Sequence, residues 1–177
     1  MQTRETRWFF DREEGNEIAN SLRMFATISD ELPRHDVYTI QRDTHTTHVV
    51  RNDIEYLEKT HHKERAITIP DVGEGYLYSC TKSETVLWPK HPHIASGIVV
   101  QKVRKLIKLS GWHIELSHIT VNDTKKYVTI WIEVSQRDGA EWLIRQWTMF
   151  LGSIYPKMTL AKSASYLEFL DAHAVGL

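Results

Sequence analysis

The chain has 177 residues, of which 41% are apolar and 25% are charged. This composition excludes a disordered or collagen-like protein and favours one globular domain, which we expect to cover residues 1–177. The 22 basic and 23 acidic residues give a formal charge of −1, which argues against nucleic-acid binding through the whole surface. The single cysteine, Cys80, excludes a disulfide framework and a zinc site made of several cysteines.

Residues 13–28 form the first expected helix, because Ile18, Leu22 and Phe25 lie on one apolar stripe at helical spacing. Pro33 ends this region. Segments rich in Thr, Val, Ile and Tyr then predict strands, and turn sequences separate these segments. The expected strands cover residues 36–41, 46–51, 65–69, 76–87, 98–109, 112–120 and 127–134.

Two more helices are expected after the last strand. Asp138 and Glu141 resemble a capping box, and the apolar sequence WLIRQWTMFLGSI follows them. Ser163 is expected to cap a short final helix. The order of a helix, many strands and further helices predicts an α+β fold around an antiparallel sheet or barrel. Trp142 and Trp147 of the second helix should pack on the barrel, and any apolar surface that this helix leaves exposed would contact a partner protein.

Apolar and polar residues alternate along the strands, so each strand has two different faces. One face of residues 127–134 is apolar and consists of Val128, Ile130, Ile132 and Val134. The opposite face carries Tyr127, Thr129, Trp131 and Glu133. Lys102, Arg104 and Lys108 share one face of residues 98–109, and Glu115 lies on the polar face of residues 112–120.

Two arrangements explain this alternation. One is a sheet with a solvated face, which is its commonest use. The other is a barrel with a polar interior, where mixed charges would indicate an ionic ligand because buried charges are costly. Basic residues would then hold phosphate oxygens, and glutamates would hold a cation such as Mg²⁺ or Mn²⁺. Residues 98–109 also fit a helical stripe, in which case their basic row would only be a solvated face.

Other kinds of site are not indicated by the sequence. It contains no P-loop and no G-x-S-x-G nucleophile elbow. None of the histidine groups has the spacing of a zinc motif, so we interpret them as surface and turn residues. These groups are His45/His48, His61/His62, His91/His93 and His113/His118.

The sequence VVQKVRKLIKLSGWHIELSHITVNDTKKYVTIWIEV resembles the late strands of the triphosphate tunnel metalloenzymes, especially the RNA 5′-triphosphatases of mRNA capping. That family has a basic strand R-x-K-x-R, then a strand W-x-I-D-L-T-x-V, then a strand with alternating glutamates. Lys102 and Arg104 match the basic strand. Glu115 stands at the position of the aspartate, and Glu133 belongs to the glutamate strand.

The order of motifs upstream also resembles this family, so that the resemblance covers residues 3–155. Glu5 and Arg7 match part of its opening E-x-E-x-R/K-F strand, Arg51 matches an arginine, and Lys63 or Lys59 matches a lysine. The sequence YLYSCTKSETV is similar to the family's R-I-S-x-x-x-E strand. Departures from the family pattern are Thr3, Tyr78, Val100, Thr129 and Trp131.

The resemblance implies an eight-stranded antiparallel β-barrel with flanking helices and a triphosphate tunnel. It also implies residue roles. The catalytic residues would be Glu115, Arg104 and Lys102. The substrate-binding residues would be Arg51, Lys63, Lys82, Lys102, Arg104 and Lys108. The metal ligands, for Mg²⁺ or Mn²⁺, would be Glu5, Glu84 and Glu133.

The implied activity is metal-dependent removal of the γ-phosphate from 5′-triphosphorylated RNA. One alternative is a non-catalytic binding module, because subunits of the Mediator head module are similar barrels without catalysis. Another is an enzyme that hydrolyses an inorganic or small-molecule triphosphate. The expected partners are the RNA end or a polyphosphate, together with a guanylyltransferase or a second copy of the chain. We expect no membrane partner, and an intracellular location in the nucleus, the cytoplasm or a viral factory, because MQTRETRWFF does not resemble a signal peptide.

Overall fold

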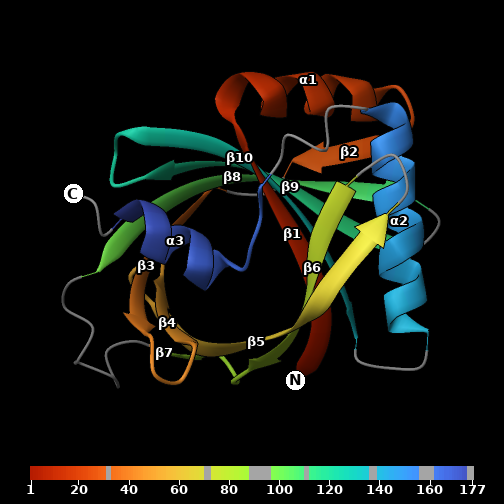
Figure 1. Ribbon diagram of the computed structural model, residues 1–177. Coiled ribbons are helices and arrows are strands. Elements are labelled where there is room, and N and C mark those ends of the chain that lie inside the picture. Colours follow the sequence, from red (N-terminus) through yellow and green to blue (C-terminus); the bar gives the residue numbers. More distant parts are fainter. Residues whose placement is uncertain are drawn as a thin grey trace.

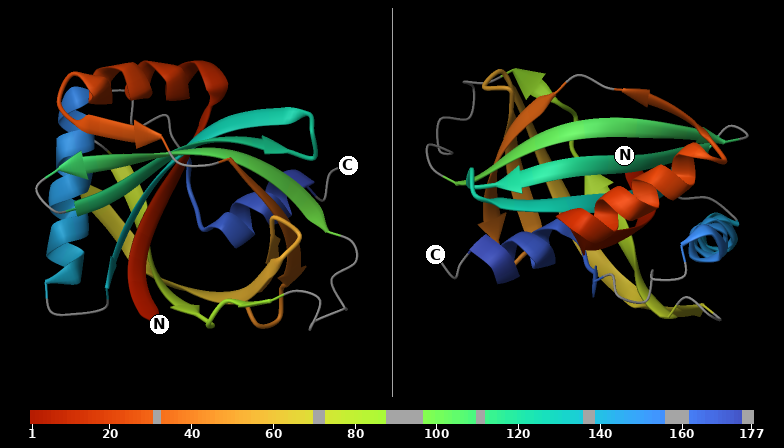
Figure 2. Two further views of the ribbon diagram at one scale, coloured as in Figure 1. Left: turned by 180° about the vertical axis from the view of Figure 1, so that it is seen from behind. Right: turned by 90° about the horizontal axis from the view of Figure 1, so that it is seen from above.

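The computed structural model describes residues 1–30, 33–69, 73–87, 97–109, 112–135, 139–155 and 162–174. The helices in these ranges are α1 (Arg12–Arg23), α2 (Ala140–Ile154) and α3 (Tyr166–Ala174). The strands are β1 (Gln2–Asp11), β2 (Thr27–Asp30), β3 (Arg34–Gln41), β4 (Thr46–Arg51), β5 (Glu55–Ile69), β6 (Gly73–Lys82), β7 (Val86–Leu87), β8 (Ile98–Leu109), β9 (Trp112–Val121), β10 (Lys125–Ser135) and β11 (Lys162–Ser163). Figures 1 and 2 show the strands curving around a common axis, with α1 and α2 on the outside.

Eight of the described strands close into an antiparallel barrel. Their order around the barrel is β1, β10, β9, β8, β3, β4, β5 and β6, and β6 pairs with β1 to close it. The short strands add to this wall, because β2 pairs with β8, β7 with β5 and β11 with β1. The predicted α+β fold with an eight-stranded barrel is confirmed, and the alternative of a sheet with one solvated face is wrong.

The first helix is shorter than the predicted range of residues 13–28. It begins after Asp11, whose side chain accepts a hydrogen bond of 3.0 Å from the backbone N–H of Glu14. It ends at Arg23, and residues 27–30 form β2 instead of a last helical turn. The β-branched residues Thr27 and Ile28 favour a strand, and their backbone pairs with β8.

The remaining strand predictions agree in position, with two corrections. β5 begins at Glu55 rather than at residue 65, because it pairs with β4 as well as with β6. Residues 76–87 are not one strand, since β6 ends at Lys82 and residues 83–85 precede β7. Residues 98–109 form β8, so the helical interpretation of the basic row is wrong.

The second predicted helix is confirmed as α2, although Asp138 lies outside the described residues. The final helix is capped by Ser165 and not by Ser163. Ser165 Oγ accepts a hydrogen bond of 3.1 Å from the N–H of Glu168, whose carboxylate accepts one of 3.4 Å from the N–H of Ser165. This reciprocal pair is a capping box. Ser163 Oγ instead accepts the backbone N–H of Tyr76 at 2.9 Å.

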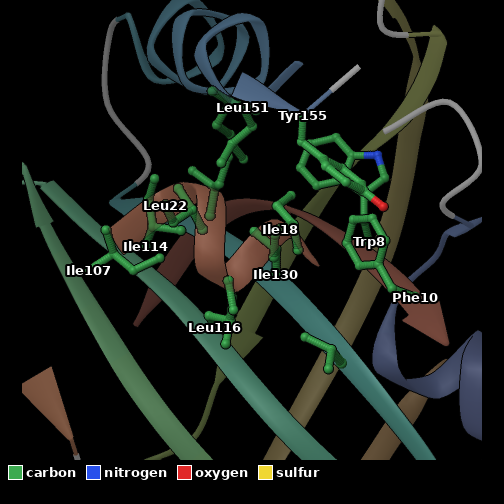
Figure 3. Close-up of a cluster of buried hydrophobic side chains, with 14 of the residues drawn as sticks. Trp8, Phe10, Ile18, Leu22, Ile107, Ile114, Leu116, Ile130, Leu151 and Tyr155 are labelled. Carbon is green, nitrogen blue, oxygen red and sulfur yellow. The ribbon is translucent and has the colours of Figure 1, made fainter. Parts of the chain in front are cut away.

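An outer apolar core lies between the barrel and the helices α1 and α2 (Figure 3). Ile18 and Leu22 of α1 and Leu151 of α2 pack with Ile114 of β9 and Ile130 of β10. The predicted apolar face of residues 127–134 therefore points outward, to the helices. Burying a side chain of this size contributes about 1.5–3 kcal/mol, so this core fixes both helices on the barrel.

The helix α2 has an apolar outer side as well. Trp147 packs at the edge of the outer core, as expected for a helix that packs on the barrel. The expectation that Trp142 also packs on the barrel is wrong, because this residue is 61% exposed, and Met149 is exposed too. Among the described helices, none has both the length and the apolar character needed to cross a membrane.

An inner apolar core fills one end of the barrel, where α3 packs against the strands (Figure 1). Phe9 of β1 stacks on Phe169 of α3 with ring centroids 3.7 Å apart. The inner core also contains Tyr38, Val49, Leu57, Val100, Ile119, Val121, Tyr166 and Leu170. Along β9 the inward residues change from Glu115 and Ser117 to Ile119, all of them buried, so the interior is polar beyond this apolar end.

Gly15 lies where α1 approaches β10. A Cβ added to Gly15 would stand 2.1 Å from the Cβ of Val128, far inside van der Waals contact. An alanine in place of glycine normally stabilises a helix by about 1 kcal/mol. We expect Gly15→Ala to lower the free energy of unfolding instead, by about 1–3 kcal/mol, because the added methyl group overpacks this contact. Urea unfolding monitored by circular dichroism measures this change.

The control for this prediction is Asn16→Ala, which changes the adjacent, exposed residue of the same helix. It should leave the free energy of unfolding unchanged or slightly higher. An increase for Gly15→Ala equal to that for Asn16→Ala would contradict the close packing of α1 on β10.

Candidate functional site

A cavity of about 340 Å³ lies in the polar part of the barrel interior. Seven of its described lining residues are cationic, namely Arg7, Arg34, Arg51, Lys59, Lys82, Lys102 and Arg104. They come from six strands, so they surround the space on several sides. The carboxylates among the described lining residues are Glu84 and Glu115. We call this space the charged cavity, and its excess of positive charge suits an anionic ligand.

A neighbouring cavity of about 380 Å³ extends the charged cavity. It shares Arg104, Glu115 and Trp131 with the charged cavity and adds Thr3 and Glu133 to the lining. The predicted inward direction of Lys102, Arg104, Glu115 and Glu133 is therefore correct, and all four line this joint space.

Asp36 of β3 is the most deeply placed carboxylate, with no exposed surface. Its two oxygens lie 3.1 Å from Lys102 Nζ and 3.3 Å from Arg51 Nε. Strand pairing causes this arrangement, because Asp36 stands opposite Arg51 in the β3–β4 pair and β3 also pairs with β8. Burial raises the pKa of Asp36, but the charges of Lys102 and Arg51 outweigh burial and hold this pKa below its ordinary value.

Arg104 and Glu115 form a second buried pair across β8 and β9. Arg104 Nη2 lies 2.8 Å from Glu115 Oε2, and Ser117 Oγ donates a hydrogen bond of 2.7 Å to Glu115 Oε1. Burial raises the pKa of Glu115, whereas the charge of Arg104 acts more strongly together with other cations and lowers this pKa to about 2. Glu115 is therefore ionised at neutral pH and can only accept hydrogen bonds.

Glu5 and Glu133 stand directly opposite each other on β1 and β10. Glu133 pairs with Lys82 Nζ and accepts a hydrogen bond of 3.2 Å from Thr3 Oγ1. Glu5 accepts one of 2.9 Å from the indole N–H of Trp131. Burial raises the pKa of Glu5, but its hydrogen bond with His61 helps to hold the pKa below the ordinary value.

Three of the cations have no carboxylate partner among the described residues. Arg7 lies between two rings, with its guanidinium carbon 4.9 Å from the centre of Trp131 and 4.3 Å from that of Tyr166. Arg34 and Lys59 form no ion pair within the described part of the chain. Their charges are therefore available to an incoming anion.

Burial also changes the pKa values of two lysines. It lowers the pKa of Lys102 to about 7, even though Asp36 favours the charged form. Burial lowers the pKa of Lys59 to about 8, and the positive charges of Lys82 and Arg51 add to this effect. The charge of the cavity therefore depends on pH near neutrality.

The structure brings most of the predicted site residues to the lining of the two cavities, but Glu5 and Lys63 are not among the described lining residues. Lys63 lies at a second cavity near α3, with its Nζ 3.5 Å from Glu168 Oε1, and Lys59 lines the charged cavity instead. Glu84 is exposed on residues 83–85, which form part of the cavity lining. The side chain of Lys108 lies outside the described residues.

Sequence reasoning missed Asp36, Arg34 and Arg7 as parts of the site. Asp36 and Arg34 differ by two positions, so a period of two could have placed them on one face of β3. Arg7 belongs to the same alternating face as Glu5, and both are buried. Side-chain alternation does not identify the residue with which each of them pairs, because that residue lies on a strand that is distant in sequence.

The predicted Mg²⁺ or Mn²⁺ ligands fit such an ion in part. Glu5 and Glu133 are neighbours that face the interior, whereas Glu84 belongs to the exposed residues 83–85. Mg²⁺ is commonly bound by one or two carboxylates together with substrate phosphates. Glu5 and Glu133 could therefore hold an ion that arrives with a triphosphate.

No protein-family model and no curated protein matches this sequence. Solved structures do match its fold. A Vibrio parahaemolyticus protein, provisionally described as an adenylate cyclase, has a TM-score of 0.56 at 12% identity, over 94% of this chain and 97% of that one. The Schizosaccharomyces pombe Pct1 RNA triphosphatase has a TM-score of 0.50 at 11% identity, over 86% of this chain and 82% of that one.

A chain of the Schizosaccharomyces pombe Mediator head module has a TM-score of 0.52 at 5% identity, over 87% of this chain and 94% of that one. The chain is thus structurally similar to triphosphate tunnel proteins. At these identities the likeness shows the fold, and the activity has to be argued from the residues of this chain.

Proposed function

We propose that this protein binds a terminal triphosphate in the charged cavity and hydrolyses its γ-phosphate, with 5′-triphosphorylated RNA as substrate. One observation carries the proposal: seven cationic residues from six strands converge on a single cavity of about 340 Å³. A triphosphate supplies the negative charge that this surface lacks. Phosphoryl transfer depends mainly on positioning and on stabilisation of charge, and lysine and arginine side chains provide both.

Individual residues take the following roles in this proposal. Arg51, Lys82, Lys102 and Arg104 hold phosphate oxygens. Glu115 is ionised and fixed by Arg104 and Ser117, so its free acceptor capacity can orient a water molecule for attack on the γ-phosphorus. An Mg²⁺ or Mn²⁺ ion bound with the triphosphate, near Glu133 in the cavity lining, would neutralise charge on the phosphate oxygens.

The closed end of the barrel favours the terminal phosphates of a substrate over its internal phosphates. Helix α3 fills one end with apolar side chains, including Phe169 and Leu170. A phosphate group that reaches the charged cavity therefore cannot continue through that end. This geometry suits the terminal triphosphate of an RNA or of a free polyphosphate.

A phosphate-release assay with the purified chain tests the proposal. The substrates are 5′-triphosphorylated RNA and tripolyphosphate, each with Mg²⁺, with Mn²⁺ and with a chelator. We expect release of one phosphate per RNA end in the presence of the metal. Release from tripolyphosphate alone would assign a small-molecule triphosphatase, and no release from either substrate would contradict the hydrolytic function.

A second candidate is a non-catalytic binding module, and one observation favours it. Each of the inward carboxylates Glu5, Asp36, Glu115 and Glu133 already contacts a basic side chain. The likeness to a Mediator head-module chain agrees with this reading. Binding of tripolyphosphate without any phosphate release would support it. The exposed Trp142 and Met149 of α2 would then offer a contact surface for a guanylyltransferase or a second copy of the chain.

Triphosphate binding should weaken as the pH rises from about 7 to about 9. Lys102 and Lys59 have pKa values of about 7 and about 8, so each is positively charged below its value and neutral above it. The bound anion raises both pKa values, which moves the loss of affinity to somewhat higher pH. Calorimetric titration with tripolyphosphate across this range measures the effect. Lys59→Gln should flatten the profile, and Lys105→Gln, outside the cavity lining, should not.

A further inference from the structure

Three side chains with metal-binding donor atoms meet in the wall of the barrel. Glu5, His61 and Cys80 each offer one such atom, and these atoms all lie within 4.8 Å of one another. Within the described ranges, no other group of three histidine, cysteine or acidic residues is this compact. The group contains one oxygen, one nitrogen and one sulfur donor.

Strand pairing assembles this group from three adjacent strands. His61 of β5 and Cys80 of β6 stand directly opposite each other. On the other side of β6, Cys80 pairs with Thr3 and Glu5 pairs with Tyr78 of the same strand. Residues opposite each other in an antiparallel pair have Cβ atoms about 4.5–5.5 Å apart, which brings their side chains within reach of one ion.

The surroundings of the three side chains resemble those of a metal centre. Glu5, His61 and Cys80 are 2%, 6% and 1% exposed. Glu5 Oε1 lies 3.1 Å from His61 Nε2, while Glu5 Oε2 accepts the indole N–H of Trp131 at 2.9 Å. A second hydrogen bond of this kind orients a ligating carboxylate in metal sites. His61 Nδ1 is buried and has no hydrogen-bond partner among the described residues.

We propose that Glu5, His61 and Cys80 bind one divalent ion of the zinc type. Carboxylate, imidazole and thiolate are all ligands of Zn²⁺, whereas Mg²⁺ prefers oxygen alone. On binding, the thiol of Cys80 loses its proton to solvent and the sulfur lone pair forms the bond to the metal, with no change of oxidation state. A water molecule takes the fourth position, supplied from the second cavity of about 210 Å³ that His61 also lines.

The ion would hold β5, β6 and β1 together. Glu5 then serves this ion, which leaves Glu133 of the cavity lining for an Mg²⁺ or Mn²⁺ ion that arrives with the triphosphate. None of the three ligands belongs to the described lining of the charged cavity. Burial raises the pKa of the Cys80 thiol to about 12, so the bond to the metal has to offset the cost of removing its proton. The charges of Lys59 and Lys82 lower this pKa and favour the thiolate, although they repel a cation. The negative charges of Glu5 and of the Cys80 thiolate together neutralise a divalent ion and offset this repulsion.

Titration of the full chain with Co²⁺, in a phosphine reductant, tests the site without any substrate. We expect near-ultraviolet absorption from thiolate-to-cobalt charge transfer that saturates at one ion per chain, and Zn²⁺ should abolish it while Mg²⁺ should not. Zn²⁺ should also raise the Tm of the protein. Cys80→Ser should remove the absorption, and His61→Gln should weaken Zn²⁺ binding about tenfold or more.

His62→Ala is the matched control, because His62 is the adjacent histidine and is exposed. It should leave the absorption and the Zn²⁺ affinity unchanged. The proposal is overturned if the wild-type chain shows no charge-transfer absorption, a result that needs no variant to fold. Unchanged Zn²⁺ affinity in folded Cys80→Ser and His61→Gln would overturn it as well. Phosphate release without this absorption would support the proposed hydrolysis and contradict the metal site. Absorption without phosphate release would support the metal site and contradict the hydrolysis.

Discussion

Replacement of Arg104 by alanine should weaken tripolyphosphate binding by roughly 10- to 100-fold and reduce any phosphate release at least as much. Arg104 of β8 lines both the charged cavity and the neighbouring cavity, and its guanidinium pairs with Glu115 of β9. A hydrogen bond to a charged group contributes about 1.5–3 kcal/mol, which corresponds to this range of affinity. The variant also removes the partner of Glu115, so the uncompensated negative charge of Glu115 repels the phosphate oxygens. Isothermal titration calorimetry gives the affinity, and γ-labelled RNA gives the rate.

The control for Arg104→Ala is Lys105→Ala, which removes one positive charge from the next residue of the same strand. Lys105 Nζ lies 3.6 Å from the exposed Asp30 and is not part of the described cavity lining. Lys105→Ala should leave affinity and rate within about twofold, because Lys105 does not line the cavity and its partner Asp30 is exposed to solvent. Equal losses in the two variants would mean that general electrostatic attraction, and not the charged cavity, binds the anion.

Replacement of Asp36 by alanine should lower the free energy of unfolding by about 3 kcal/mol or more. Asp36 has no exposed surface and neutralises Lys102 and Arg51. Its removal leaves these two cations close together in the interior, and an uncompensated buried charge typically costs about 3–5 kcal/mol. Urea unfolding at neutral pH measures the loss. The double variant Asp36→Ala with Lys102→Met should recover part of it, because one buried charge is removed as well.

Acidification provides a second test of Asp36. Because the folded state holds the pKa of Asp36 below its ordinary value of 3.8, the carboxylate stabilises the fold fully above about pH 4. This contribution is lost as the pH falls through the lower, folded-state pKa. The wild type should therefore lose more stability than Asp36→Ala when the pH is lowered from about 5 to about 2. Parallel acid profiles for the two chains would contradict a stabilising role of this carboxylate.

Much of the candidate site could be predicted because strand alternation is a local property of the backbone. Lys102, Arg104, Glu115 and Glu133 share the inward face with their neighbours two positions away, and this parity is visible in the sequence. Parity does not give the position along the barrel axis. Lys59 and Lys63 have the same parity on β5, yet Lys59 reaches the charged cavity and Lys63 lies near α3.

The partners of these residues could not be predicted from local pattern. Asp36 meets Lys102 because β3 pairs with β8, and His61 meets Cys80 because β5 pairs with β6 in one register. The histidines were expected to be surface and turn residues, but His61 is 6% exposed. No spacing in the sequence indicates these contacts, since the residues of each pair belong to different strands.

The sequence by itself indicated most of the barrel strands, which of their faces is apolar and several of the residues that bring charge to the polar face. Side-chain alternation with a period of two is sufficient for this, because it follows from backbone geometry. Only the tertiary structure decided that the polar faces point into a closed barrel, that α3 fills one end, and which cation lies beside which carboxylate. These features depend on pairing and burial between distant segments, which set both the charge of the cavity and the pKa values of its residues.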